Sequence, residues 1–257
     1  MYDFTGKVCL VTGGTSGIGL RVSERLIDAG AQLIVLGRDA SKGQEVAQRL
    51  GERCLFVPCD VADAAQVEDV FQTIDRRYGL LDCAFNNAGV TARHAEVVES
   101  CAQDWDRVMA INISGTYNCM KQELRLMQAQ GRHGAIVNTS SSAGVLPLAG
   151  QVAYSVSKQA INTMTQVASI ENARFADGGC IRVNAVAPGP ILGGMNTQER
   201  LLASPRNTQR KIDVTSMKRF GRADEVANAV LWLLSEQSSY VTGHILSVDG
   251  GYASGKF

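Results

Sequence analysis

The segment Val8-Cys-Leu-Val-Thr-Gly-Gly-Thr-Ser-Gly-Ile-Gly19 joins a short apolar run to a glycine-rich turn. Val8 to Val11 has the composition of a buried strand, and Ile18 to Ala29 has helical periodicity. Glycine permits positive φ angles and lets the backbone approach a pyrophosphate, whose charge is favoured by the unpaired amides of a helix N-terminus. The strand, turn and helix together predict a nucleotide-binding crossover, and the alternative is a glycine-rich turn without a ligand.

Apolar runs and helical stretches alternate along the whole chain. The expected strands are Val8 to Val11, Leu33 to Leu36, Leu55 to Val57, Leu81 to Asn86, Ala135 to Asn138, Ile181 to Val186 and Ile245 to Val248. The expected helices are Ile18 to Ala29, one from Ser41, Val67 to Tyr78, Val108 to Met127, Val152 to Phe175 and Glu225 to Leu234. This alternation predicts an α/β, doubly wound Rossmann fold: a seven-stranded parallel sheet with helices on both faces, in one domain spanning residues 1–257.

Composition excludes several classes of protein. The 257 residues are 45% hydrophobic and carry 25 basic and 25 acidic side chains, so no basic excess points to nucleic acid. There is no apolar run of about 18 residues, and the glycine-rich motif starts too early for a preceding signal peptide, so we expect a cytoplasmic protein without a membrane span. Seven cysteines without a Cys-x-x-Cys pair are expected to be mostly reduced, buried thiols. The three histidines lie far apart, and no metal site is expected.

Tyr154 and Lys158 are four residues apart in Tyr-Ser-Val-Ser-Lys. On a helix this spacing places both side chains on one face, so an ammonium can lie beside a phenol. An adjacent cation favours the phenolate and lowers a pKa that is ordinarily about 10. The pair is a weak motif alone and gains weight from the glycine-rich crossover.

These motifs resemble those of the short-chain dehydrogenases/reductases, including 3-oxoacyl-reductase-like members, over nearly the whole chain. The shared segments are Thr12 to Gly19, Asp60-Val61, Asn86-Asn87-Ala88-Gly89, Pro188-Gly189 and Val248-Asp-Gly-Gly251. The resemblance implies the catalytic residues Asn112, Ser141, Tyr154 and Lys158. The implied cofactor-binding residues are Gly13, Thr15, Ser16, Gly17, Ile18, Gly19, Arg38, Asp60, Val61, Asn87, Ala88, Gly89, Tyr154, Lys158, Pro188, Gly189 and Ile191.

Two of the catalytic assignments have alternatives. Ser141 lies 13 residues before Tyr154, the family's usual separation, but Ser140 or Ser142 could also donate a hydrogen bond. We expect those two serines to satisfy backbone groups at the strand end and in the following turn. Asn112 could be a polar residue that hydrogen-bonds backbone within a helix, and the family resemblance instead gives it a water that links Lys158 to solvent.

The resemblance implies hydride transfer between a nicotinamide and a ketone or secondary alcohol. Tyr154 would protonate the ketone oxygen, or act as the phenolate base in oxidation, with its pKa lowered by Lys158 and the nicotinamide charge. Ser141 would hold the substrate oxygen. Lys158 would also hydrogen-bond the nicotinamide ribose.

The choice of cofactor depends on Leu36-Gly37-Arg38-Asp39. The NAD-selecting acid of the family would stand at Gly37, whereas Arg38 is the residue type associated with the NADP 2′-phosphate, which a guanidinium suits. Against this, Asp39 lies within the window for a ribose-binding acid, and Ser16 stands where some NADP-preferring members carry a base. We favour NADP(H), with NAD(H) as the alternative and a solvated Arg38 as the reading without a ligand.

The substrate pocket can be located only in outline. Ser142 to Gly150, with its apolar residues, is expected to form one wall. Val90 to Glu96, with Arg93 and His94, either borders the opening or, as we favour, is exposed loop charge. Residues 189–214, including Met195 and Leu201, lack clear periodicity and are expected to form a mobile lid. In that segment Leu192-Gly193-Gly194 replaces the usual threonine, and Thr197 is displaced from its place.

Four functions remain open from the sequence. An NADPH-dependent carbonyl reductase leads, followed by an NAD-dependent alcohol or diol dehydrogenase. A dinucleotide-binding regulator without turnover and a structural protein are the other two. Apolar residues on more than one face of the helices at 108–127 and 152–175 favour a homodimer or homotetramer, in which the tail from Val248 to Phe257 could meet a neighbour. The residues between Asn172 and Cys180 form a loop longer than usual for the family.

Overall fold

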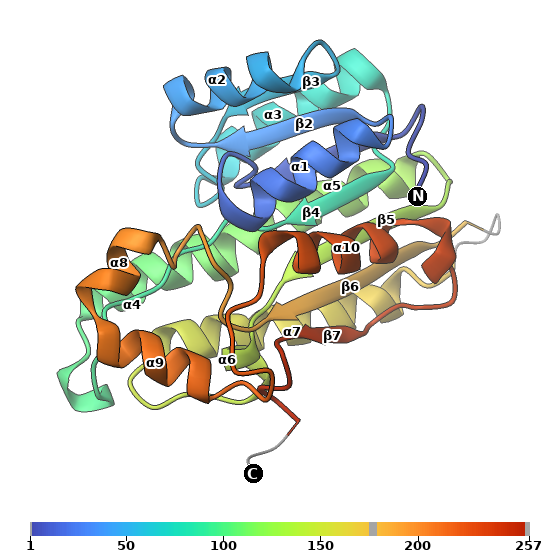
Figure 1. Cartoon of the computed structure of the whole chain (residues 1–257). Coiled ribbons are helices and arrows are strands. Elements are labelled where there is room, and N and C mark those ends of the chain that lie inside the picture. Colours follow the sequence, from blue (N-terminus) through green and yellow to red (C-terminus); the bar gives the residue numbers. More distant parts are fainter. Residues whose placement is uncertain (1, 175–178, 255–257) are drawn as a thin grey trace.

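A seven-stranded sheet forms the centre of the computed structural model, which describes residues 2–174 and 179–254. All strands run parallel in the order β3-β2-β1-β4-β5-β6-β7 (Figure 1). The strands are β1 (Val8–Thr12), β2 (Gln32–Gly37), β3 (Cys54–Pro58), β4 (Cys83–Asn86), β5 (Gly134–Thr139), β6 (Ile181–Pro188) and β7 (Ile245–Val248). The predicted doubly wound parallel sheet is therefore confirmed.

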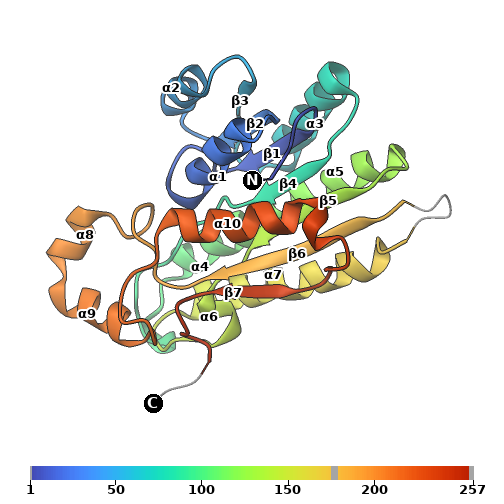
Figure 2. The same cartoon turned by 45° about the vertical axis from the view of Figure 1, so that its right-hand side comes forward.

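Helices cover both faces of this sheet. The α-helices are α1 (Gly17–Asp28), α2 (Ala40–Leu50), α3 (Ala64–Tyr78), α4 (Ala102–Val108), α5 (Gly115–Ala129), α6 (Ser142–Val145), α7 (Val152–Glu171), α8 (Gln198–Ala203), α9 (Pro205–Asp213) and α10 (Ala223–Leu234). Shorter helical turns are η1 (Val97–Glu99), η2 (Met109–Ser114) and η3 (Glu236–Ser238). Figure 2 shows α10 in front of the sheet and α7 behind it.

Alternation along the strands produces two separate cores. Cys9 and Val11 of β1 join the core beneath α1, α2 and α10, whereas Val8 and Leu10 join the core beneath α3, α5 and α7. Successive side chains of a strand point to opposite faces, and in a parallel sheet both faces are buried. The strands were predictable from sequence for this reason, because each is a nearly continuous apolar run.

Two predicted elements differ from the structure. The helix expected over Val108 to Met127 is interrupted, because Met109–Ser114 forms a π-helical turn between α4 and α5. The segment 189–214, in which the sequence shows no clear periodicity, contains α8 and α9, which pack mainly on each other and project beyond the strand ends (Figure 1). Both helices are short and polar, so they lack the apolar periodicity that marks a helix packed on a core. The expected end at Phe175, and part of the loop from Asn172 to Cys180, lie outside the described residues.

The strand order places a crevice between β1 and β4. The chain leaves β1 toward β2 and β3 on one side, and β4 starts the other half of the sheet on the other side. At such a reversal, loops after adjacent strands diverge and leave room for a ligand beyond the carboxyl ends of the strands. The glycine-rich turn after β1 and the Asn86–Gly89 segment after β4 meet here.

Candidate active site

The glycine-rich turn is held in place by the segment after β4. Thr12 Oγ1 accepts hydrogen bonds from the Asn87 and Ala88 amides at 2.9 and 3.0 Å. Asn87 Nδ2 donates to the carbonyl oxygens of Thr12 and Gly13. A Cβ on Gly19 would overlap the Gly13 carbonyl, so only glycine permits this approach of helix and turn. The turn is thus shaped by residues 75 positions away in sequence.

A cavity of about 270 Å³ opens over this turn. Twelve of the predicted cofactor-binding residues line it: Gly13, Ser16, Gly17, Ile18, Asn87, Ala88, Gly89, Tyr154, Lys158, Pro188, Gly189 and Ile191. Thr139 also lines the cavity, and its buried Oγ1 has no hydrogen-bond partner among the described residues. An open glycine cradle at a helix N-terminus, with a lysine and a free hydroxyl beside it, fits a dinucleotide.

Five predicted cofactor residues lie outside that lining: Thr15, Gly19, Arg38, Asp60 and Val61. Gly19 acts through packing, as described above. Asp60 Oδ1 accepts a hydrogen bond from the Ala62 amide, and Val61 is buried against Gly115. Thr15 lies beside Gly37, since a Cβ there would be 3.3 Å from Thr15 Cγ2. The structure therefore does not place these five residues in the lining of the cavity.

Arg38 and Asp39 have different surroundings. The Asp39 side chain caps α2 by accepting a hydrogen bond from the Lys42 amide at 3.0 Å. Arg38 is exposed, and its side chain has no hydrogen bond or ion pair within the described part of the chain. The acid is therefore already engaged by its own helix, whereas the guanidinium is free to meet a ligand.

Tyr154 and Lys158 lie on one face of α7, with Lys158 Nζ 5.7 Å from the centre of the Tyr154 ring. Lys158 is buried, and its Nζ donates to the Thr139 carbonyl at 2.7 Å. Burial lowers the pKa of Lys158 to about 8. Two side chains from one helix turn are thus directed to the end of β5.

The pKa of Tyr154 departs from the sequence-based expectation. Burial raises the pKa of this phenol above its ordinary value, and a hydrogen bond with Ser141 lowers it only in part. The expected lowering by Lys158 is wrong for the protein alone, because desolvation of the phenolate outweighs other effects. A protonated phenol at neutral pH suits a proton donor better than a base.

The three consecutive serines after β5 have different partners. Ser141 lies beside Tyr154 and caps α6 by accepting a hydrogen bond from the Ala143 amide. Ser140 Oγ donates to the Lys158 carbonyl at 3.3 Å. Ser142 is buried at the start of α6 and lines a neighbouring cavity. Ser141 is the serine with a recorded hydrogen bond to the Tyr154 phenol.

Asn112 occupies the π-helical turn and is fully buried. Its Oδ1 accepts from the Val90 amide at 2.8 Å, and its Nδ2 donates to the Val90 carbonyl and to Ser157 Oγ. The alternative of a hydrogen bond within its own helix is therefore wrong, since Asn112 bonds a separate loop and helix α7. The register shift of a π-turn reorients side chains and is common at functional sites.

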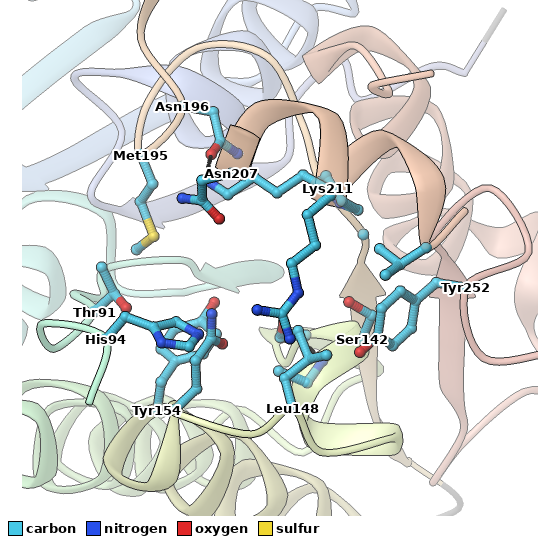
Figure 3. A pocket seen from close by; sticks show the side chains of 17 residues that line it. Thr91, His94, Ser142, Leu148, Tyr154, Met195, Asn196, Asn207, Lys211 and Tyr252 are labelled. Carbon is cyan, nitrogen blue, oxygen red and sulfur yellow. Dashed lines mark hydrogen bonds between the residues drawn. The ribbon is translucent and has the colours of Figure 1, made fainter. Parts of the chain in front are cut away.

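A second cavity of about 190 Å³ adjoins the first. The two cavities share the residues Ser141, Tyr154, Gly189, Met195 and Asn196. Figure 3 shows the second cavity with His94, Tyr154 and Leu148 on one side and Asn196, Asn207 and Lys211 across from them. Tyr154 therefore stands where the cavity over the glycine-rich turn meets the smaller one.

The walls of the second cavity were predicted only in part. Ser142, Ala143 and Leu148 belong to the expected wall, but Val145 and Leu146 are exposed, and Leu201 does not line the cavity. His94 and Arg93 are exposed, as the favoured interpretation expected, but His94 also lines the cavity, and a Cβ on Gly150 would overlap its ring.

Sequence reasoning missed the contribution of α9. Asn207, Arg210 and Lys211 from this helix line the cavity. No local pattern marks them, although Arg210 and Lys211 are adjacent basic residues within the segment that was expected to form a lid.

Residues at the start of the 189–214 segment approach the glycine-rich turn. A Cβ on Gly17 would lie 3.2 Å from Gly194 Cα, and Gly193 and Gly194 both have positive φ angles. Thr197 instead caps α8 by accepting a hydrogen bond from the Arg200 amide. The backbone of two glycines therefore covers the cavity where a threonine side chain was expected from the resemblance.

Within residues 2–174 and 179–254 no helix is long and apolar enough to cross a membrane, and no group of three histidine, cysteine or acidic side chains could hold a metal ion. All seven cysteines are free thiols, of which Cys9, Cys59, Cys83 and Cys119 are buried.

Comparisons with known proteins identify the family of this chain. Residues 13–253 match a family model described as enoyl-(acyl carrier protein) reductase. The chain is 33% identical to levodione reductase of Leifsonia aquatica, over 98% of this chain and 96% of that protein. It is 38% identical to a 3-oxoacyl-[acyl-carrier-protein] reductase of Thermotoga maritima, covering 96% and 97% of the two chains. A crystal structure of levodione reductase superposes with a TM-score of 0.91 at 31% identity, covering 99% of this chain and 100% of that one.

Proposed function

Since the chain belongs to the short-chain dehydrogenase/reductase family, whose members interconvert alcohols and ketones with NAD(P), we propose that it is an NADP(H)-dependent carbonyl reductase with Tyr154 as the general acid. One observation carries the proposal: Tyr154 and Ser141 stand at the junction of the dinucleotide cavity and the smaller cavity. A ketone in the smaller cavity would meet both hydroxyls and the open end of the larger one.

Tyr154, Ser141 and Lys158 have separate roles in the proposed reaction. A nicotinamide coenzyme held in the larger cavity would supply the hydride. Tyr154, protonated at neutral pH because burial raises its pKa, donates the proton that the developing alkoxide requires. Ser141, whose hydroxyl lies within hydrogen-bonding distance of the same phenol, holds the substrate oxygen. Lys158 keeps a positive charge beneath the phenol and is anchored to the Thr139 carbonyl.

The test of this mechanism is Tyr154→Phe, assayed by NADPH oxidation with a panel of ketones. Turnover is expected to fall by at least about a hundredfold, because general acid catalysis contributes roughly 10² to 10⁴. Coenzyme affinity should stay unchanged. Tyr117→Phe, on the exposed part of α5, is the matched control and should keep full activity. Retained turnover in Tyr154→Phe would refute the mechanism.

NADP(H) is proposed over NAD(H) because Asp39 is used as a helix cap and Arg38 is free. A guanidinium binds a 2′-phosphate with charge-assisted hydrogen bonds. Arg38→Ala is expected to weaken NADPH roughly tenfold or more and to leave NADH unchanged, as measured by nicotinamide fluorescence. Arg53→Ala, another exposed arginine nearby in the chain, is the control. Equal weakening of both coenzymes would remove the proposed role of Arg38.

An NAD-dependent alcohol or diol dehydrogenase is the second candidate. A 2,5-dichloro-2,5-cyclohexadiene-1,4-diol dehydrogenase of Sphingobium indicum is 33% identical over 99% of this chain and all of its own. Tighter binding of NADH than of NADPH would favour this candidate, and coenzyme binding without any turnover would favour a non-catalytic regulator. The cytoplasmic location and the lid role of residues 189–214 stay predictions.

A further inference from the structure

The lining of the smaller cavity contains basic side chains and no acidic ones. Arg210, Lys211 and His94 line it, and no aspartate or glutamate is among its lining residues. The other polar groups of the wall include Thr91, Gln151, Asn196 and Asn207, all of which can donate hydrogen bonds. A substrate cavity for a neutral ketone needs no such concentration of cations.

The acids near this cavity form no ion pair with Arg210 or Lys211 within the described residues. Asp249 Oδ1 and Oδ2 accept hydrogen bonds from the amides of Gly251 and Ala253. Asp213, the last residue of α9, accepts a hydrogen bond from Gln209 Nε2 at 2.8 Å. Glu199 of α8 is exposed. The positive charge of Arg210 therefore has no carboxylate partner within the described residues.

Lys211 and Arg210 are placed differently. Lys211 Nζ donates to Asn196 Oδ1 at 2.7 Å, which holds it at the border shared with the dinucleotide cavity (Figure 3). Burial, and to a lesser extent the charge of Arg200, lowers the pKa of Lys211. Arg210 lines the smaller cavity and not the larger one. It is close enough to Tyr252 that its charge lowers the pKa of that phenol, although burial and the charge of Asp249 raise this pKa by more.

We propose that the physiological substrate is a compact carbonyl compound or alcohol with an anionic group, carboxylate or phosphate, that Arg210 binds. This inference rests on the proposed function, whose substrate class it names. Lys211 would complement the same charge and His94 could donate a hydrogen bond to it, while Ser141 and Tyr154 hold the oxygen to be reduced. A planar guanidinium can bind either anion through two parallel hydrogen bonds. The cavity, about 190 Å³, is below the usual range for larger ligands.

The experiment measures ligand binding apart from turnover. The protein is first saturated with NADP⁺ or NAD⁺, whichever it binds more tightly, so that it cannot reduce a ketone. Each probe is then titrated into this complex by calorimetry. The probes are pyruvate, acetoacetate and levulinate, each against its methyl ester, and dihydroxyacetone phosphate against dihydroxyacetone. The comparison separates a carboxylate from a phosphate as the recognised group. At least one anion is expected to bind roughly tenfold to a hundredfold more tightly than its neutral partner.

Variants of α9 identify the side chain responsible. Arg210→Gln should remove the preference for the anion, and Arg210→Lys should retain part of it because the charge stays while the bidentate geometry is lost. Arg206→Gln is the matched control, since Arg206 is exposed on the same helix and does not line the cavity. It should keep the preference in full.

The inference is overturned if no anion is preferred over its neutral partner, if the preference survives Arg210→Gln, or if Arg206→Gln removes it equally. Its failure differs from that of the proposed function. Tyr154-dependent reduction of neutral ketones without anion preference would leave the reductase standing and remove the anion site. Anion preference without turnover of any probe would leave the anion site standing and remove the proposed reductase activity.

Discussion

Glu123 is a buried acid that the proposed mechanism does not use. It lies on α5 beneath the sheet, where its Oε2 accepts a hydrogen bond from Asn86 Nδ2 at 2.8 Å. The same Asn86 amide donates to Asn138, and Glu123 Oε1 has no partner in the part of the chain that is described. Burial raises the pKa of Glu123 to about 8, although the Asn86 hydrogen bond lowers it in part. The carboxyl is therefore protonated at neutral pH.

This acid gives stability a defined pH dependence. In the unfolded chain a glutamate titrates at roughly 4.3, so between about pH 4.3 and 8 the folded state binds the extra proton. Stability from this group is complete below the lower value and is lost as pH rises toward the folded pKa of about 8. Glu123→Gln does not titrate, so its free energy of unfolding relative to wild type should rise with pH, by up to about 1.4 kcal/mol per pH unit.

Urea unfolding at several pH values between 5.5 and 7.5 measures this difference. The control is Glu68→Gln on the exposed face of α3, whose difference from wild type should not change with pH. A difference between Glu123→Gln and wild type that is constant with pH would contradict a raised pKa at Glu123.

The π-helical turn η2 joins three elements through one side chain. Asn112 connects the loop after β4, at Val90, to α7, at Ser157. A continuous α-helix from α4 through α5 would turn Asn112 to a different direction. The turn therefore positions the loop that starts at Val90, which contributes Thr91 and His94 to the second cavity, relative to α7, the helix that carries Tyr154.

Removal of this connection should destabilise the protein. Asn112→Ala loses three hydrogen bonds and leaves the Val90 amide and carbonyl unpaired at a buried site, which is expected to cost about 2–4 kcal/mol of unfolding free energy. Chemical denaturation measures the loss. Asn118→Ala on α5 removes a single hydrogen bond to the Val61 carbonyl and should cost about 1 kcal/mol. Equal midpoints for the Asn112 variant and wild type would contradict the structural role.

Helix α7 leaves an apolar stripe in solvent. Val156, Val167 and Ile170 are 42%, 48% and 78% exposed, and they recur on one side of the helix. Tyr117 of α5 is also about half exposed. An unpaired apolar surface on two long helices favours association of identical chains, which supports the proposed homodimer or homotetramer.

Light scattering after size exclusion tests the assembly. Wild type is expected to elute as a dimer or tetramer, and the double variant Val167→Lys, Ile170→Lys should shift toward the monomer because burying two ammonium groups is costly. Val97→Lys, Val98→Lys, which charges exposed valines of η1, is the control and should keep the wild-type mass. A monomeric wild type would refute the proposed association.

Features that depend on residues close together in sequence were predicted well, whereas features that depend on distant contacts were not. The strands were predictable because residues such as Val8 to Val11 belong to apolar runs buried on both faces. Helix boundaries were predicted less well: α3 begins at Ala64, three residues before the predicted start at Val67, because the Asp63 side chain caps it by accepting hydrogen bonds from the Ala65 and Gln66 amides. Helices α8 and α9 were missed because polar helices that pack mainly on each other have little apolar periodicity.

The features of the candidate site also fall into a local group, which was predicted, and a long-range group, which was not. The glycine spacing and the Tyr154–Lys158 pair are local, and the structure brings both to one cavity. The partners of Asn112, the cap formed by Asp39 and the entry of Arg210 into the smaller cavity depend on the path of the chain. No periodic pattern encodes them.

The sequence by itself determined the alternation of strands and covering helices along the chain, the glycine-rich crossover and the helical face shared by Tyr154 and Lys158. These features follow from residue preferences over a few positions, which act before any distant contact forms. Only the tertiary structure decided the direction of the Tyr154 pKa and the positive charge of the smaller cavity. Both depend on burial and on which side chains from distant segments converge, because desolvation and Coulomb energies are set by distances in space rather than in sequence.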